Sequence, residues 1–210
     1  MSPLSNQGSQ DWLNERAGFV TASRFADVLE VGANGKPKKA REDYMMKLVV
    51  ERITGQASES ASSAAMVWGK DAEPFARKEY EMQTGRIVTE SNFLKHPEHK
   101  WIGASPDGLI ASDGGYESKC PHNSAVHLRT LRDGMPLEHI AQVQGCMFVS
   151  GRVWWDFISY DPRMPPELRL HVQRIQRDEA YIRALENKLL DFLAEVQVEV
   201  NSFKNFKVAA

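Results

Sequence analysis

Cysteine is scarce in this sequence of 210 residues: Cys120 and Cys146 are the only two, too few for a disulfide framework or a four-cysteine zinc site. The chain also lacks an apolar run of membrane-spanning length, and residues 1–10 lack the apolar core of a signal peptide. The net charge is −2, whereas many nucleic-acid-binding domains carry an excess of basic residues. A local basic patch remains compatible with this net charge. These absences favour the cytoplasm and exclude a disulfide-stapled secreted domain.

The remaining composition suits one folded domain. Hydrophobic residues make up 42% of the chain and charged residues 26%, which supplies a sizeable core at this length. No internal repeat or low-complexity tract divides the sequence. We therefore predict a single domain over residues 1–210.

Helical and extended patterns alternate along this domain. Apolar spacing, capping residues and glycine stops at Gly55 and Gly85 predict helices over residues 21–29, 42–54, 64–84, 137–149 and 178–203. β-Rich runs predict strands over residues 87–90, 101–104, 107–111, 116–120, 152–160 and 168–175. The segment Asp113-Gly114-Gly115 is typical of a hairpin turn. This alternation predicts an α/β fold with helices on both sides of the strands.

The expected helix over residues 42–54 is amphipathic. Its apolar residues at helical spacing are Met46, Val49, Val50 and Ile53. This stripe is the side that we expect to face the core.

One cluster of residues indicates chemistry. Glu117 and Lys119 are two apart, so on a strand they point to the same face. The predicted hairpin brings them beside Asp107, and two carboxylates with the Ser118 carbonyl suit a hard divalent cation such as Mg²⁺. Lys119 would orient or deprotonate the attacking water, which is the chemistry of metal-assisted phosphodiester hydrolysis. A bare pattern of this kind also arises by chance in roughly 5% of chains of this length.

Three further features have both a functional and a structural interpretation. Glu73 shares a helical face with small and apolar residues, so it is either a metal-site carboxylate or a boundary glutamate that reaches water. Gln142 and Gln144 point about 200° apart on a helix, so only one faces the strands, and Gln144 is either a phosphate ligand or a surface residue. Arg16 with the hydroxyl of Ser23 forms either an anion site or an ordinary helix cap.

These features occur in an order that resembles the phage lambda exonuclease family, the YqaJ-like viral recombinase exonucleases of the PD-(D/E)xK nuclease superfamily. The resemblance covers about residues 12–179. The motifs that carry it are Arg16, Val20-Thr-Ala-Ser23, Trp68-Gly-Lys70 with Glu73, Ser105-Pro-Asp-Gly-Leu109, Glu117-Ser-Lys-Cys-Pro121, Ala141-Gln-Val-Gln144 and Tyr160-Asp-Pro-Arg-Met164.

The resemblance implies a central mixed β-sheet flanked by helices, with a restriction-endonuclease-like core. It implies a Mg²⁺-dependent 5′→3′ exonuclease on linear double-stranded DNA, which releases mononucleotides and leaves a 3′ single strand for recombination by strand annealing. Two metal ions per site are expected, with Mn²⁺ as a substitute for Mg²⁺. A homotrimeric ring, a single-strand-annealing partner, and a phage or prophage setting in the cytoplasm of a bacterial host are also implied.

Residue roles follow from the same resemblance. Asp107, Glu117 and the Ser118 carbonyl would be metal ligands, Lys119 would activate water, and Glu73 would serve the second metal. The 5′-phosphate pocket would comprise Arg16, Ser23, Ser105 and Gln144. Met66 would be a wedge that separates the terminal base pairs.

One position departs from the family pattern. The family has an arginine that guides the single strand where this sequence has Ala125, and the nearby candidates to replace it are His122, His127 and Arg129. Three other interpretations stay open at this point: a PD-(D/E)xK endonuclease, a catalytically silent DNA-end-binding protein, and an unrelated α/β domain.

Overall fold

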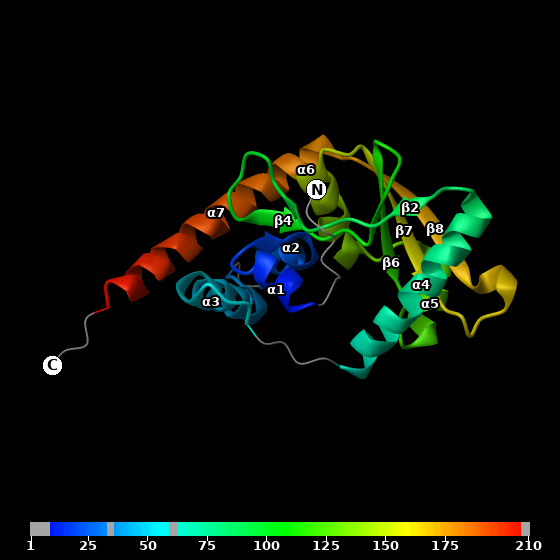
Figure 1. Ribbon diagram of the computed structural model, residues 1–210, viewed down its shortest axis with the longest axis horizontal. Coiled ribbons are helices and arrows are strands. Elements are labelled where there is room, and N and C mark those ends of the chain that lie inside the picture. Colours follow the sequence, from blue (N-terminus) through cyan, green and yellow to red (C-terminus); the bar gives the residue numbers. More distant parts are fainter. Residues whose placement is uncertain (1–8, 33–35, 59–62, 207–210) are drawn as a thin grey trace.

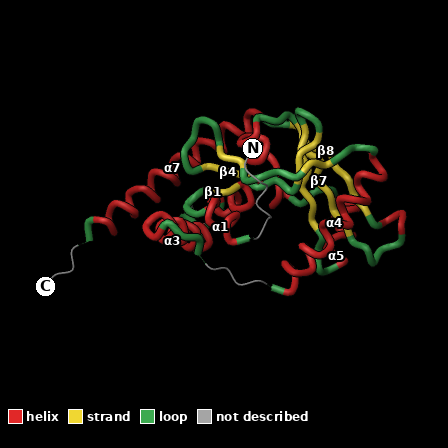
Figure 2. Tube along the Cα trace, in the orientation of Figure 1, coloured by secondary structure: helices red, strands yellow, loops and turns green. Residues whose placement is uncertain are grey.

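A computed structural model describes residues 9–32, 36–58 and 63–206 of the chain. It is a mixed α/β structure with two sheets and surrounding helices (Figures 1 and 2). The α-helices are α1 (Gln10–Arg16), α2 (Phe25–Leu29), α3 (Lys39–Thr54), α4 (Ala64–Thr84), α5 (Ser124–Asp133), α6 (Ile140–Ser150) and α7 (Glu179–Lys204). The strands are β1 (Val20–Thr21), β2 (Val88–Thr89), β3 (Leu94–Lys95), β4 (Ile102–Ala104), β5 (Gly108–Ile110), β6 (Gly114–Lys119), β7 (Trp154–Tyr160) and β8 (Leu170–Gln176). Short 3₁₀ turns, η1 (Ala22–Arg24), η2 (Leu137–His139) and η3 (Pro166–Leu168), connect some of these elements.

The larger sheet has the strand order β2-β5-β6-β7-β8. Its central pair β6–β7 is parallel and the other pairs are antiparallel, which confirms the expected mixed sheet. The smaller sheet, β1-β4-β3, pairs Thr21 with Gly103 and so joins the N-terminal segment to the strand that leads to Asp107.

Helices cover both faces of the larger sheet. Tyr80 of α4 contacts Tyr116 of β6 on one face. On the other face, His127 of α5 is bonded to Ser159, and Gln142 of α6 is bonded to Glu117. Helix α6 also packs against α2 and α7, and most of its residues are buried. Among the described helices, none is both long and apolar enough to cross a membrane.

Several predicted elements are confirmed. The long helices end at Gly55 and Gly85 as expected, and both glycines adopt the left-handed conformation, with φ of 71° and 68°. The C-terminal helix extends over Glu179–Lys204, against the predicted 178–203. Helices α1 and α5 are absent from the prediction, because they contain only 7 and 10 residues and a short helix gives a weak periodic signal.

The prediction for the hairpin turn is wrong in one respect. The β5–β6 hairpin exists, but its turn is formed by residues 111–113, and Gly114 and Gly115 lie inside β6. Their lack of a side chain serves packing, because a Cβ at Gly115 would lie 2.3 Å from the ring of Trp155. The positive φ in the turn, 48°, belongs to Ala111.

The predicted apolar stripe of α3 is also largely wrong. Val49 is buried, whereas the side chains of Met46, Val50 and Ile53 are 37%, 48% and 46% exposed. The buried face of α3 instead includes Tyr44 and Glu51, which hold polar partners.

Candidate active site

Asp107, Glu117 and Lys119 come together at one end of the β5–β6 hairpin. Asp107 directly precedes β5 and Lys119 is the last residue of β6, so the antiparallel pairing places them side by side. The backbone N–H of Ser118 donates to Asp107 Oδ2 at 2.8 Å, and the Ser118 hydroxyl approaches the same oxygen at 3.2 Å. Lys119 Nζ lies 2.7 Å from Glu117 Oε1, which confirms that these side chains share a face of the strand.

Glu117 is buried and Asp107 is partly buried. Burial, and next to it the charge of Asp107, raises the pKa of Glu117 to about 7. Burial also raises the pKa of Asp107. Burial lowers the pKa of Lys119, but the charges of Glu117 and Asp107 outweigh this effect and the net shift is upward. The positive charge of Lys119 alone therefore does not neutralise the negative charge of the Asp107 and Glu117 carboxylates.

Glu73 approaches the same cluster from α4. Burial, followed by the charge of Asp107, raises its pKa to about 7, while Lys119 and Lys70 oppose that shift. The boundary interpretation of Glu73 accounts for its partial exposure, but not for its electrostatic coupling to Asp107. Glu73 is thus a third carboxylate near the end of the hairpin.

The residues fit a divalent cation. Glu117 Oε2 is buried and has no hydrogen-bond partner among the described residues, and an unpaired buried carboxylate oxygen is costly unless a cation binds it. Among residues 9–32, 36–58 and 63–206, no three His, Cys, Asp or Glu side chains are gathered closely enough to form a site by themselves. The predicted donor set of two carboxylates and the Ser118 carbonyl does not need a third side chain, since Mg²⁺ usually keeps several waters.

The structure corrects the choice between the two glutamines of α6. Gln142, not Gln144, faces the cluster: its Nε2 donates to Glu117 Oε1 at 2.5 Å, and its Oε1 accepts from Lys119 Nζ at 3.1 Å. Gln144 is 2% exposed, and its amide binds the backbone carbonyl of Gln176 and the backbone N–H of Asp178. These hydrogen bonds join α6 to the start of α7. Gln144 therefore has a structural role, and its predicted place in a phosphate pocket is wrong.

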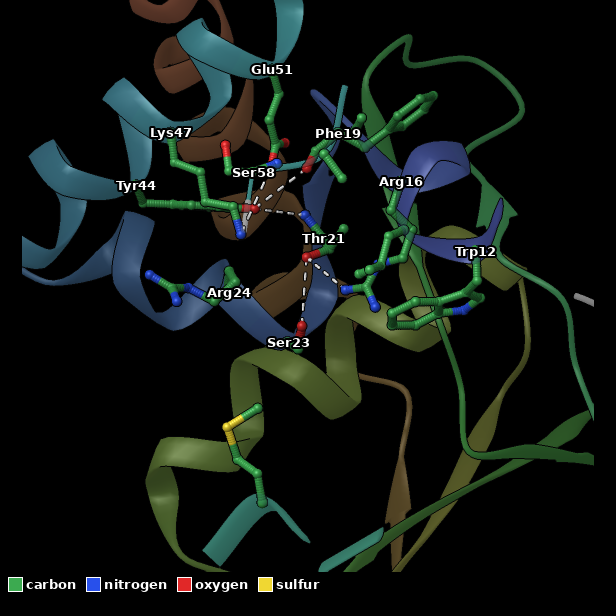
Figure 3. Close-up of a pocket in the computed structure, with 14 residues that line it drawn as sticks. Trp12, Arg16, Phe19, Thr21, Ser23, Arg24, Tyr44, Lys47, Glu51 and Ser58 are labelled. Carbon is green, nitrogen blue, oxygen red and sulfur yellow. Dashed lines mark hydrogen bonds and ion pairs between the residues drawn. The ribbon is translucent and has the colours of Figure 1, made fainter. Parts of the chain in front are cut away.

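A separate pocket contains Arg16, Ser23 and Met66 (Figure 3). The Arg16 guanidinium approaches the Thr21 hydroxyl at 3.5 Å and stacks over the Trp12 ring at 3.9 Å from its centroid. The pocket also holds the cations Arg24 and Lys47. Met66 is 57% exposed at the start of α4. It lies seven residues before Glu73, which corresponds to a rise of about 10 Å along the same face of the helix.

Ser105 is not among the residues that line this pocket. It lies in the segment between β4 and β5, two residues before Asp107. Its hydroxyl is buried and has no hydrogen-bond partner within the described part of the chain. Ser105 is therefore close in sequence to Asp107, and its role as a phosphate ligand stays a prediction.

The surroundings of Ala125 narrow the candidates for the missing arginine. His127 is fully buried, and its two ring nitrogens lie 2.7 Å from the Ser159 hydroxyl and the Leu168 carbonyl. It is thus a structural residue of α5 and does not take the place of the family arginine. His122 and Arg129 are exposed. Arg163 lies close to His122: it is bonded to the His122 carbonyl and stacks over Trp68 with 4.4 Å to the ring centroid.

Comparisons with known proteins find similarities over most of the chain. The YqaJ-like viral recombinase domain matches residues 11–153. The crystal structure of the alkaline exonuclease LHK-Exo from Laribacter hongkongensis is 41% identical in sequence, with a TM-score of 0.85 over 93% of this chain and 96% of that chain. The structure of LHK-Exo in complex with dAMP gives 42% identity and a TM-score of 0.86 at the same coverage.

Two further similarities are more limited. A phage-related exonuclease from Haemophilus somnus 129PT is 14% identical, with a TM-score of 0.66 over 88% of this chain and 94% of that chain, and therefore supports the fold alone. The protein ExoD of Escherichia coli (strain K12) is 36% identical over 58 residues, which span 28% of this chain and 66% of that relative. The similarities to solved exonucleases confirm the predicted restriction-endonuclease-like α/β fold.

Proposed function

The chain belongs to the YqaJ-like viral recombinase domain family, and on that premise we propose that it is a Mg²⁺-dependent exonuclease that degrades linear duplex DNA in the 5′→3′ direction. The coarse activity, DNA exonuclease, follows from the family and from the identity to an alkaline exonuclease over 93% of the chain. The metal, the polarity and the role in recombination are our proposal. The dAMP complex of LHK-Exo supports mononucleotide products, because dAMP is a nucleoside monophosphate.

The observation that carries the proposal is the cluster at the end of the β5–β6 hairpin. Asp107, Glu117 and the Ser118 carbonyl would hold the cation, with Glu73 serving a second one. A divalent cation bound there supplies Lewis-acid stabilisation of the charge that develops on the phosphodiester. Mn²⁺ would substitute for Mg²⁺, since both prefer oxygen ligands.

Lys119 would act on the attacking water. Two of its three N–H groups are used by Glu117 and Gln142, which leaves one to bind the nucleophile or the phosphodiester. Because the pKa of Lys119 is raised above its ordinary value, Nζ keeps its proton at neutral pH. A protonated Lys119 would therefore orient the attacking water and stabilise negative charge on the phosphodiester.

The pocket around Arg16 and Ser23 would receive the 5′-phosphate. A guanidinium beside hydroxyl groups suits a terminal phosphate, and the pairing of β1 with β4 joins this segment to the strand before Asp107. Ser105, whose buried hydroxyl has no hydrogen-bond partner among the described residues, would bind a phosphate nearer the cleavage point. Met66 at the pocket wall would separate the terminal base pair.

The assembly and its setting are proposed on the same premise. We expect a homotrimeric ring around the duplex and cooperation with a single-strand-annealing protein, in a phage or prophage setting within a bacterial host. Light scattering on the purified chain tests the trimer: a mass of one or two chains under conditions of full activity would contradict it.

The decisive experiment uses one linear duplex with a 5′-phosphate at one end and a 5′-hydroxyl at the other, and a closed circular duplex as control. Wild type and Lys119→Ala are incubated with Mg²⁺ or with EDTA. We expect digestion of the linear DNA alone, from the phosphorylated end, and no digestion by Lys119→Ala or in EDTA. Cutting of the circle would indicate an endonuclease, and retained activity in EDTA would contradict the metal mechanism.

A further inference from the structure

One face of α3 forms a wall of the pocket opposite Arg16. Tyr44, Lys47 and Glu51 are spaced by three and four residues, so they share a helical face, and all three line the pocket together with Arg16 and Ser23 (Figure 3). Two of them are buried: Tyr44 is 3% exposed and Glu51 is 6% exposed. A buried phenol and a buried carboxylate at an anion pocket need an explanation that phosphate binding by cations does not supply.

Tyr44 holds the C-terminal part of the segment from Arg16 to Ser23, which carries the proposed phosphate ligands. Its hydroxyl accepts a hydrogen bond from the Thr21 backbone N–H at 3.0 Å and lies 3.5 Å from the Phe19 carbonyl. Thr21 in turn contacts both Arg16 and Ser23 through its hydroxyl, at 3.5 Å in each case. The Tyr44 hydroxyl thus fixes the backbone from which these side chains are arranged.

Glu51 holds the other end of the same segment. Its Oε2 accepts from the Gly18 backbone N–H at 2.8 Å, and its Oε1 accepts from the Ser58 backbone N–H at 3.1 Å. The adjacent Arg52 donates to the Gly18 carbonyl at 2.9 Å, so both polar backbone groups of Gly18 are bound by α3. The Glu51 carboxylate thus accepts two backbone hydrogen bonds and lies 3.8 Å from Lys47 Nζ. These partners balance its negative charge in the pocket wall.

The same arrangement supports the charge of Arg16. Burial lowers the pKa of Arg16, and the Glu51 carboxylate opposes that shift. The pocket can therefore keep a desolvated guanidinium, which binds a phosphate more strongly than a solvated one, without losing its protonation.

We propose that Tyr44 and Glu51 are positioning residues for recognition of the DNA 5′ end: together they hold the segment from Arg16 to Ser23 in its phosphate-binding conformation. This inference rests on the proposed exonuclease function and goes beyond it, because neither residue needs to touch the DNA. Ordering a flexible segment on binding costs conformational entropy and lowers the affinity for phosphate. A segment that is already ordered avoids this cost. Tyr44 and Glu51 thereby set the ratio by which the enzyme prefers a phosphorylated end to a hydroxyl end.

The test compares Tyr44→Phe and Glu51→Gln with wild type on two duplexes that differ only in a 5′-phosphate or a 5′-hydroxyl. Tyr44→Phe keeps the buried ring and removes the acceptor for Thr21. Glu51→Gln keeps the size of the side chain but replaces one accepting oxygen by a donor. We expect the ratio of kcat/KM for the two ends to fall about threefold to tenfold in Tyr44→Phe and about tenfold or more in Glu51→Gln, through KM on the phosphorylated end, with the rate on hydroxyl ends preserved.

Two matched controls separate positioning from stability. Tyr80→Phe removes a buried tyrosine hydroxyl that is 2.7 Å from Asp156, away from the pocket. Glu195→Gln weakens the pair of contacts between Arg41 of α3 and Glu195 of α7. Both controls should lower Tm and keep the wild-type phosphate preference.

The outcomes are distinguishable. If wild type prefers phosphorylated ends and folded Tyr44→Phe and Glu51→Gln keep that preference, the positioning role is wrong while the exonuclease proposal stands. If wild type shows no preference, the phosphate pocket is wrong and this inference is overturned with it. Should Glu51→Gln fail to fold, Tyr44→Phe decides the question alone, because it leaves the packing of the ring intact.

Discussion

Gln142 donates its side-chain N–H to the carboxylate of Glu117, with 2.5 Å between Nε2 and Oε1. The other end of the same amide accepts from Lys119 Nζ at 3.1 Å. One side chain of α6 therefore fixes the relative position of a proposed metal ligand and of the proposed water-orienting lysine. It also leaves Glu117 Oε2 as the oxygen without a protein partner among the described residues.

Replacing Gln142 by Leu should slow catalysis without unfolding the protein. Partners that orient metal ligands are typically worth about 10-fold to 100-fold in metal affinity or activity, so we expect a loss of that size in kcat and a higher Mg²⁺ concentration for the half-maximal rate. The measurement is a Mg²⁺ titration of the digestion rate on a linear duplex, together with a thermal melt.

The matched control is Gln144→Leu on the same helix. It would leave the Gln176 carbonyl and the Asp178 N–H without their partner, which costs about 1–3 kcal/mol for each buried group. We expect a lower free energy of unfolding and an unchanged Mg²⁺ dependence. The reverse result, a catalytic defect at Gln144 and a structural one at Gln142, would contradict the assignment of the two glutamines.

The sequence could not decide between these glutamines for a physical reason. Helix α6 is buried on nearly all sides, including Gly145, Cys146 and Met147, so it lacks the polar stripe that reveals which face of a helix meets solvent. The strand residues were easier: alternation alone places Glu117 and Lys119 on one face, and the β5–β6 pairing confirms their approach to Asp107.

Helix α3 illustrates the opposite failure. Its apolar spacing points to Met46, Val50 and Ile53, which are partly exposed, whereas the buried positions include Tyr44 and Glu51. The polar side chains of Glu51 and Tyr44 are buried because they accept hydrogen bonds from the backbone N–H groups of Gly18 and Thr21, which belong to a distant segment. Such partners depend on tertiary contacts and leave no periodic signal in the sequence.

The response of Tm to Mg²⁺ should depend on pH. The pKa of Glu117 is about 7 in the folded, metal-free protein and about 4.5 in the unfolded chain. The folded state therefore binds more protons between these values, so the free energy of unfolding falls as pH rises through about 4.5 to 7 and the loss is complete above it. A cation at the carboxylates removes this penalty, so Mg²⁺ should raise Tm more above pH 7 than below pH 5.

Differential scanning fluorimetry with and without Mg²⁺ measures this effect. Glu117→Gln should reduce the pH dependence, because the side chain no longer ionises; Glu73, whose pKa is also about 7, would account for the remainder. An equal Mg²⁺ shift at both pH values in wild type would contradict a cation site at these carboxylates.

Met66 offers a test of strand separation with little risk to the fold. Its side chain is 57% exposed, so Met66→Ala should change the free energy of unfolding by no more than about 0.5 kcal/mol. Unstacking a base pair costs a few kcal/mol, and we expect digestion of a blunt duplex to slow by about tenfold when the wedge is removed.

A duplex with two unpaired nucleotides at its 5′ end distinguishes separation from binding. Met66→Ala should digest this frayed substrate at the wild-type rate. Val67→Ala is the matched control, since Val67 is 51% exposed on the same turn but does not line the pocket. Equal slowing on blunt and frayed ends would show that Met66 serves another step.

Gly115→Ala should damage the fold at the strand that carries the catalytic residues. A Cβ at Gly115 would lie 2.3 Å from the ring of Trp155, which is fully buried in the core. Overpacking of this kind costs about 1–3 kcal/mol or more, and because β6 has to move away from β7, the cost should come with a loss of activity through Glu117 and Lys119. Gly55→Ala is the control: a Cβ there meets no atom of the described residues within 4 Å, so the expected cost is that of the left-handed backbone alone, about 1 kcal/mol. Urea unfolding of both variants with activity at low denaturant checks the prediction, and a Gly115→Ala protein as stable as Gly55→Ala would mean that the contact between β6 and Trp155 is looser than the structure describes.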